Sequence, residues 1–201
     1  EVALTANANL AEGPVWDDRD DVLWGVDIFR GEVHRFDPAT GKDAMWTVEG
    51  PVGSLALRDK GGLIISRSDG IYAYDPGGEP VALARPEPER THNRFNDGRT
   101  DRAGRFWVGS LHRDEIEATG ALYRLDPDGT CTRAADGVIA SNGTAFSPDG
   151  RTGYHADSRR RVVWSFACDP DSGDLSDRRV FLELDPREGA PDGAIVDWDG
   201  C

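Results

Sequence analysis

Five positions of this sequence share a setting that suits metal chemistry, because each directly precedes a glycine and they recur at intervals of 40 to 50 residues. The residues are Glu12, Val52, Asp97, Asn142 and Asp192. Four of the side chains carry oxygen and three are carboxylates, which would repel one another if the fold brought them together. A bound cation would offset that charge and take the oxygens as ligands. The all-oxygen set favours Ca²⁺, Mg²⁺ or Mn²⁺, and it also admits Zn²⁺ or Fe²⁺ where the geometry permits.

The spacing of these positions indicates which fold would bring them together. Five segments share one pattern, and their leading glycines are Gly13, Gly53, Gly98, Gly143 and Gly193. A repeat of this length with several strands per unit is typical of a β-propeller blade. The first strand of each blade lines the central channel, so equivalent positions of successive blades meet on one axis. The alternative is that these Asp-Gly and Asn-Gly pairs only mark turns.

Local sequence chemistry agrees with short strands separated by turns. Apolar and aromatic runs that suit strands include VLWGVDI, LIISRS, RFWVGS and VVWSFAC. Asp-Pro pairs recur at one phase of the four complete units, at Asp37, Asp75, Asp126 and Asp169, where we expect the turn after the third strand. No long stretch has helical periodicity, and a β-sandwich would lack this long-period similarity. The sequence therefore predicts an all-β propeller.

The number of units has a consequence for the length of the native chain. Four complete units and the start of a fifth, DGAIVDWDGC, do not close a ring. An open propeller would expose sheet edges, which natural proteins avoid. We therefore expect residues 1–201 to form a single β-propeller domain that is truncated at its C-terminus. About two further blades of ~45 residues each would complete it.

Composition argues against several classes of partner. The formal net charge of −14 disfavours phosphate backbones and anionic lipid surfaces, so we expect neither nucleic acid nor a membrane as partner. The N-terminal sequence has no signal-peptide pattern, and the three cysteines form no CxxC pair, which favours reduced thiols in a cytoplasmic protein. Without a G-x-S-x-G elbow, a P-loop or a G-x-G-x-x-G motif, a serine hydrolase and a nucleotide cofactor are not indicated.

Seven ordered segments resemble the gluconolactonase and regucalcin family of sugar lactonases across nearly the whole chain. They are LAEGPVWD, NRFNDG, AGRFWVGS, GALYRLDPDG, SNGTAFSPDG, YHADS and APDGAIVDWDG. The resemblance implies a six-bladed β-propeller, of which this chain would hold about four blades and the start of a fifth. It also implies one divalent metal ion in the channel, with Ca²⁺ as the first candidate.

The same resemblance assigns roles to individual residues. It implies that Glu12, Asn142 and Asp192 ligate the metal, that Asp192 is the catalytic base, and that Arg94 and Asn96 bind the substrate. Periodicity alone selects Asp97 instead of Asn96, and we follow the motif because the strand register is not known from sequence.

Several nearby residues have two interpretations each. Asp157 is a candidate for a supporting role beside the metal. His155 is either a base or ligand, or a packed strand residue, which is commoner. The loop that contains His112, Asp114 and Glu115 is long enough to influence specificity, although solvated loop charges are the simpler interpretation.

The expected activity is metal-dependent hydrolysis of a sugar lactone to its aldonic acid, in which a Lewis acid stabilises the oxyanion. One alternative is a related metal-dependent esterase or organophosphatase on the same scaffold. The other alternative is a non-catalytic propeller that binds a metal or a protein partner.

Overall fold

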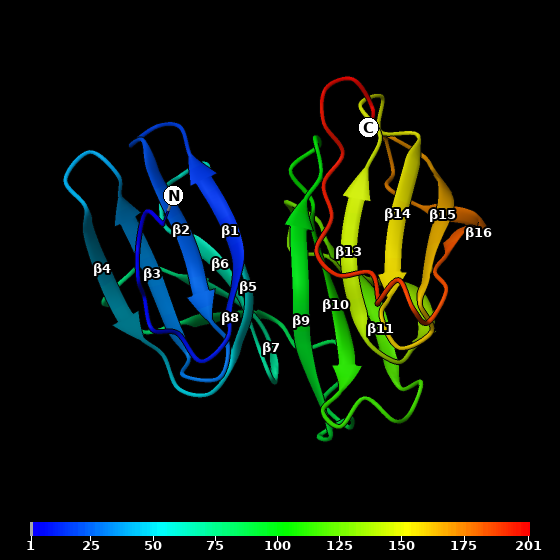
Figure 1. The fold of residues 1–201 in the computed structure, drawn as a ribbon, viewed down its shortest axis with the longest axis horizontal. Coiled ribbons are helices and arrows are strands. Elements are labelled where there is room, and N and C mark those ends of the chain that lie inside the picture. Colours follow the sequence, from blue (N-terminus) through cyan, green and yellow to red (C-terminus); the bar gives the residue numbers. More distant parts are fainter. Residues whose placement is uncertain (1) are drawn as a thin grey trace.

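The computed structural model describes residues 2–201, which form sixteen strands and no helix. The strands are grouped in four antiparallel sheets of four strands each, and every sheet contains four strands that are consecutive in the chain. This arrangement, shown in Figure 1, confirms the all-β architecture and the four repeating units. The described residues contain no helix that is long and apolar enough to cross a membrane.

Each sheet corresponds to one unit of the sequence repeat. The first contains β1 (Ala11–Asp17), β2 (Val22–Asp27), β3 (Glu32–Asp37) and β4 (Lys42–Thr47). The second contains β5 (Val52–Leu57), β6 (Leu63–Arg67), β7 (Gly70–Tyr74) and β8 (Val81–Ala84). The third contains β9 (Asn93–Thr100), β10 (Phe106–His112), β11 (Gly120–Leu125) and β12 (Cys131–Val138). The fourth contains β13 (Ser141–Phe146), β14 (Thr152–Asp157), β15 (Val162–Cys168) and β16 (Leu175–Glu183).

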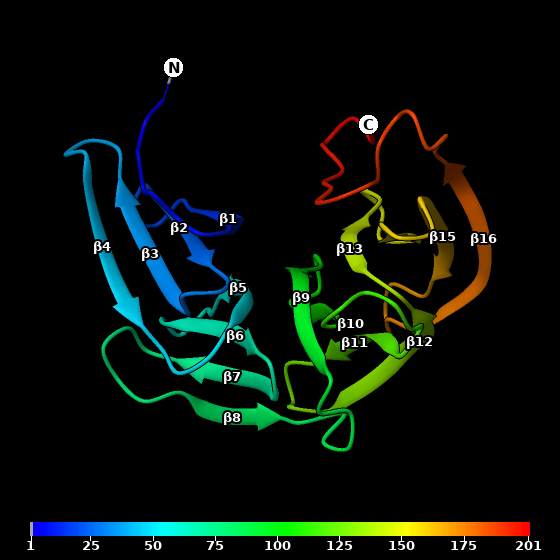
Figure 2. The same ribbon diagram turned by 60° about the horizontal axis from the view of Figure 1, so that its bottom comes forward.

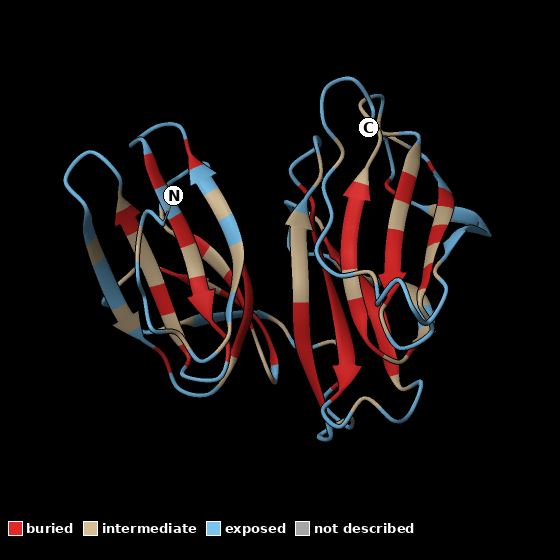
Figure 3. Cartoon of the chain, viewed as in Figure 1, coloured by how far each residue is buried: buried red, intermediate tan, exposed pale blue. Residues whose placement is uncertain are grey.

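The four sheets follow one another around an arc, like blades of an open propeller (Figure 2). Their first strands are innermost: β5 contacts β1 and β9, and β9 contacts β13. Hydrophobic clusters lie between successive sheets, for example Val26, Leu55 and Ile65 between the first two and Ile71 with Phe95 between the next two. Figure 3 shows buried residues along β10 and β13 and exposed residues along β4 and the C-terminal segment, while β1 is mostly intermediate or exposed.

The Asp-Pro turns occur where the sequence predicts them. Asp37 ends β3, and Asp75, Asp126 and Asp169 directly follow β7, β11 and β15, so all four lie after the third strand of a sheet. The Asp37 carboxylate accepts a hydrogen bond from the amide of Ala39 at 2.8 Å, and Asp169 accepts one from Asp171 at 2.9 Å. An aspartate that bonds to an amide two residues later stabilises a turn, which explains why this residue type recurs here.

The start of the fifth unit forms no strand in the structure. Residues 184–201 contain turns and extended segments, and the segment around Asp192 runs beside β13, where its backbone comes close to Gly143. The first strand of a blade forms its hydrogen bonds with the second strand of the same sheet. The described residues contain no strand after this segment, so it has no partner of this kind among them.

Candidate functional site

Two of the predicted metal ligands lie at matching β-bulges. In β1 the pairing with β2 shifts between Glu12 and Val15, and in β13 the pairing with β14 shifts between Asn142 and Ala145. The residues that follow the two ligands are Gly13 and Gly143, with φ of 57° and 50°. Glycine adopts this left-handed conformation with little strain, and a bulge redirects the adjacent side chain. The bulges therefore give Glu12 and Asn142 equivalent positions in the first and fourth sheets.

The bulge of β9 settles how the third sheet aligns with the other two. Phe95 pairs with Ser110 and Gly98 with Val108, so Asn96 and Asp97 together lie opposite one residue of β10. When the three bulges are superposed by their strand pairing, Asn96 matches Gly13 and Gly143. Gly98 then lies two residues after the matching position. Aligning Gly98 with Gly13 and Gly143, which selected Asp97 from the sequence, therefore puts β9 two residues out of register with β1 and β13.

Arg94, Asn96 and Asn142 are connected by hydrogen bonds. The Arg94 guanidinium Nη1 donates to Asn96 Oδ1 at 2.6 Å, and Asn96 Nδ2 donates to Asn142 Oδ1 at 2.9 Å. Arg94 and Asn96 are 8% and 9% exposed, so both side chains are buried. Residues from two sheets are thereby fixed as one polar unit at the channel.

Ser158 links this unit to the segment of Asp192, and sequence reasoning missed it. Asn142 Nδ2 donates to Ser158 Oγ at 2.7 Å, and Ser158 Oγ donates to the carbonyl oxygen of Pro191 at 2.6 Å. The Asn142 amide is thus oriented with its nitrogen toward Ser158 and its Oδ1 toward Asn96. Ser158 ends the motif YHADS, but only the fold brings it to Asn142 and Pro191.

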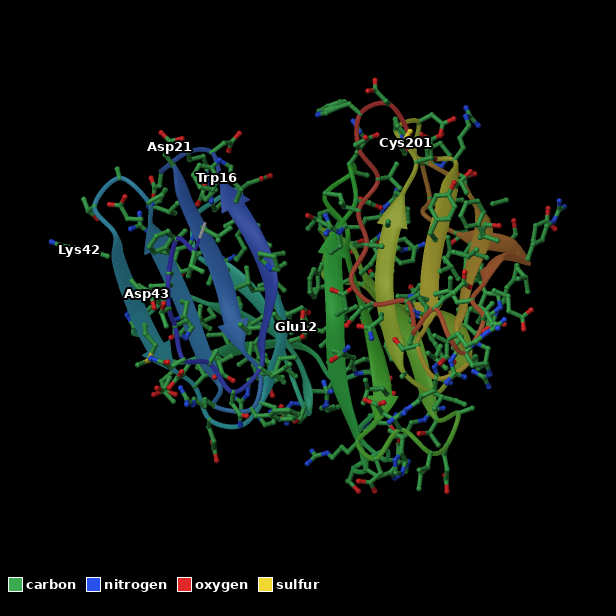
Figure 4. All side chains as sticks on the ribbon, in the orientation of Figure 1. Glu12, Trp16, Asp21, Lys42, Asp43 and Cys201 are labelled. Atoms are coloured by element: carbon green, nitrogen blue, oxygen red, sulfur yellow. The ribbon has the colours of Figure 1, made fainter. Side chains whose placement is uncertain are left out.

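Glu12 completes the group of charges at the channel. Figure 4 shows Glu12 projecting from β1 toward β9. Burial raises the pKa of its carboxyl group, and the negative charges of Asp192 and Asp97 raise it further, whereas Arg94 opposes them. Burial also raises the pKa of Asp97, against the nearby charge of Arg99. The charges of Asp192 and Asp97 therefore disfavour the ionised form of Glu12.

The donor chemistry fits a hard divalent cation. Glu12 and Asp192 offer carboxylate oxygens and Asn142 offers an amide oxygen whose orientation is fixed, and such ligands suit Ca²⁺ or Mg²⁺. Within residues 2–201 no group of three or more His, Cys, Asp or Glu side chains is arranged to hold a metal. A cavity of about 640 Å³ lies beside Glu12 and Asp97 and extends between Leu55 and Ile195.

His155 and Asp157 do not join the polar unit. His155 is 1% exposed and its Nδ1 lies 3.1 Å from Thr144 Oγ1; burial lowers its pKa to about 4, as for a packed histidine. Asp157 is fully buried and accepts a hydrogen bond from the amide of Ile139 at 2.9 Å. In the first sheet, the Asp27 carboxylate likewise accepts a hydrogen bond from the amide of Asn9 at 2.6 Å. Asp157 thus holds the connection that leads into β13, which is a repeated feature of the fold.

Four radially arranged four-stranded antiparallel sheets, with their first strands innermost, define part of a β-propeller. The family model for the SMP-30/gluconolactonase/LRE-like region matches residues 10–201, and the chain therefore belongs to that family.

Individual relatives agree with this assignment. The chain is 38% identical over 194 residues to 6-deoxy-6-sulfogluconolactonase of Pseudomonas putida, covering 96% of this chain and 66% of that protein. It is 35% identical to Xenopus laevis regucalcin, covering 100% of this chain and 69% of that protein. The solved structure of an Agrobacterium tumefaciens regucalcin, described as a calcium-binding protein, superposes with a TM-score of 0.90 at 27% identity and covers 96% and 67%. The chain thus spans about two thirds of the length of the relatives it matches.

Proposed function

We propose that the protein hydrolyses a sugar lactone to its aldonic acid and uses one divalent metal ion, with Ca²⁺ as the first candidate. Family membership supports the reaction, since one relative is named as a lactonase. The observation that carries the proposal is the connected unit of Arg94, Asn96 and Asn142, which lies next to the Asp192 segment and within reach of the charge of Glu12. A propeller that served only as a scaffold would have no need for a buried arginine fixed in this way.

Glu12, Asn142 and Asp192 would hold the metal. When bound, a divalent ion of this kind acts as a Lewis acid toward an ester carbonyl. Ser158 supports this set because it fixes the Asn142 amide, and the Asn96 amide does so from the other side. Calcium is favoured because all three donors are oxygens, and because a structural relative is described as calcium-binding.

Arg94 and Asn96 would bind the lactone. Nη1 of Arg94 is engaged by Asn96 and by the carbonyl oxygen of Phe95 at 3.2 Å, so the remaining guanidinium N–H groups are the ones that would meet the substrate. Asp192 is exposed and would accept a proton from the attacking water. The water oxygen forms a bond to the carbonyl carbon, the ring C–O bond breaks, and the ring oxygen takes up a proton to become a hydroxyl group.

The wider expectations follow from the same family assignment. We propose a six-bladed ring as the complete propeller, with residues 1–201 forming part of one domain. We also propose a cytoplasmic location, because all three cysteines are free thiols. The substrate would be a small molecule, and the chain's net charge of −14 disfavours nucleic acid and membrane surfaces.

The decisive experiment compares the full-length wild type with Asp192→Ala. We expect wild type to contain about one divalent ion per chain by elemental analysis, and to hydrolyse gluconolactone or xylonolactone in a chelator-sensitive reaction. Asp192→Ala should lose both properties. Turnover of organophosphates or simple esters instead would favour the related hydrolase, and metal binding without any turnover would favour the non-catalytic propeller.

A further inference from the structure

A buried carboxylate lies in the connection between the second and third sheets, outside the site described above. The Glu87 side chain is 4% exposed. It accepts hydrogen bonds from Ser110 Oγ at 3.0 Å, Tyr123 OH at 2.9 Å and Asn93 Nδ2 at 3.3 Å. Burial and the charge of Glu87 both raise the pKa of Tyr123, so its hydroxyl group remains a donor. Burying a carboxylate is costly unless its oxygens are satisfied, and here three donors satisfy them.

Asn93 connects this carboxylate to the loop of residues 113–119. Asn93 is 1% exposed and directly precedes Arg94. Its Nδ2 donates to the carbonyl oxygen of Thr119 at 3.1 Å, and its Oδ1 accepts from Thr119 Oγ1 at 2.7 Å. The other end of the loop is held next to it, because Arg113 Nε donates to the Asn93 carbonyl oxygen at 3.2 Å. Arg90 Nη1 also donates to the Thr119 carbonyl oxygen and lies 3.7 Å from Glu87 Oε2. Asn93 therefore holds both ends of the loop, and Arg90 supports the end at Thr119.

The loop lies beside the proposed substrate-binding arginine. The loop begins directly after His112, which pairs with Asn93, and the preceding residue Leu111 pairs with Arg94. Glu115 forms an ion pair with Arg159 at 2.7 Å, on the turn between β14 and β15. The loop thus reaches from the third sheet to the fourth, next to Arg94.

We propose that Glu87 and Asn93 are positioning residues that set the start of β9, and with it Arg94, together with the loop of residues 113–119. The role rests on the proposed function in that Arg94 is taken to bind the lactone. Neither residue touches the channel group directly. Glu87 aligns Asn93, and Asn93 holds the loop ends and the residue beside it in the chain. The loop and Arg94 therefore move together or not at all.

The test uses the full-length protein with Glu87→Gln and Thr119→Val. Glu87→Gln places an amide N–H₂ among three donors. Thr119→Val removes only the bond to Asn93 Oδ1 and keeps the carbonyl acceptor. Asp101→Asn is the matched control, because Asp101 is a buried carboxylate bonded to Arg105 and Trp107 but follows the opposite end of β9.

Two readouts separate positioning from general destabilisation. We expect KM for gluconolactone to rise about 5- to 50-fold in Glu87→Gln, with kcat changed far less, because one buried donor loses its acceptor. Amide hydrogen exchange in residues 113–119 should accelerate in both variants. Asp101→Asn should lower the thermal midpoint but leave KM and the exchange of this loop unchanged.

The outcomes are distinguishable from failure of the proposed function. If wild type cleaves no lactone, the lactonase proposal fails, and the exchange of residues 113–119 still decides whether Glu87 and Asn93 hold the loop. If the folded variants keep wild-type KM and wild-type exchange in the loop, the positioning role is wrong. If Glu87→Gln does not fold, Thr119→Val provides the test, because it alters only one hydrogen bond at the end of the loop. Faster exchange in residues 113–119 would then support the positioning role, and wild-type exchange would contradict it.

Discussion

Gly143→Ala tests whether the bulge of β13 and the Asp192 segment form one site. Gly143 has φ of 50°, and a Cβ atom at this position would lie 2.6 Å from the carbonyl oxygen of Asp192. An alanine in this left-handed conformation costs roughly 1–2 kcal/mol. The clash adds a second effect, since real Cβ contacts stay beyond 3.0 Å and the Asp192 backbone must retreat by at least 0.4 Å.

The size of that retreat predicts the effect on metal binding. Metal–ligand distances are held within about ±0.2 Å, so a shift of this size exceeds what a ligand tolerates. We expect divalent metal affinity to fall by about 10- to 100-fold, as for loss of a residue that orients a ligand. The affinity is measured by calorimetric titration of the apo protein with Ca²⁺ and with Mn²⁺.

Gly150 provides a matched control for backbone strain. It lies in the turn between β13 and β14 with φ of 69°, and its added Cβ would meet only Pro170 at 3.7 Å. Gly150→Ala should lose stability through the same strain, seen as a thermal midpoint lowered by about 2–4 °C per kcal/mol. Equal metal affinity in Gly143→Ala and Gly150→Ala would refute a link between Gly143 and the metal site. The effect of Gly143→Ala would then come from backbone strain alone and not from its contact with Asp192.

Three further predictions concern single side chains. Arg94→Ala should lower kcat/KM for the lactone by about 10- to 150-fold, which corresponds to the loss of one hydrogen bond to a charged group. Elemental analysis should show that the variant retains its bound metal. Loss of the metal would contradict a role of Arg94 in substrate binding. Ser158→Ala should weaken metal affinity in titrations by about 10-fold because the Asn142 amide is no longer oriented, whereas Ser147→Ala on the surface of the same sheet should have no effect. His155 has a pKa lowered from 6.5 to about 4, so the unfolded chain binds a proton more readily and stability should fall as pH drops from 6.5 toward 4. Urea unfolding at pH 7 and pH 5 should show a smaller loss for His155→Gln than for wild type, and equal losses would exclude this cause.

Sequence could predict the repeating features of the fold because each recurs with the same local chemistry. The Asp-Pro turn is one example: the carboxylate of Asp37 and that of Asp169 form the same bond to an amide two residues later. The leading glycines are another: Gly13 and Gly143 recur in sequence, and both adopt a left-handed φ that favours glycine. Such features need no knowledge of distant contacts, so the family segments and the four units were correctly predicted.

Sequence could not predict features that depend on register and on distant contacts. The bulge in β9 contains Asn96 and Asp97 and no glycine, so an alignment on glycines placed the third unit out of register. Ser158 and Pro191 meet only because the chain returns beside β13 after the fourth sheet is complete. Glu87 likewise lies in an irregular connection, where no periodic pattern marks it, and its three partners come from three different strands.

The residue before the glycine that begins each unit differs between sheets, which explains why only some units contribute to the site. In the first and fourth sheets a bulge at the glycine follows Glu12 and Asn142. In the second sheet the pairing of β5 with β6 also shifts at Gly53, but Val52 takes the ligand position and is fully buried. An added Cβ on Gly53 would lie 2.5 Å from the carbonyl oxygen of Phe95. That glycine permits β5 and β9 to approach closely. The second sheet therefore supplies no polar group, but its close packing fixes the strand that carries Arg94 and Asn96.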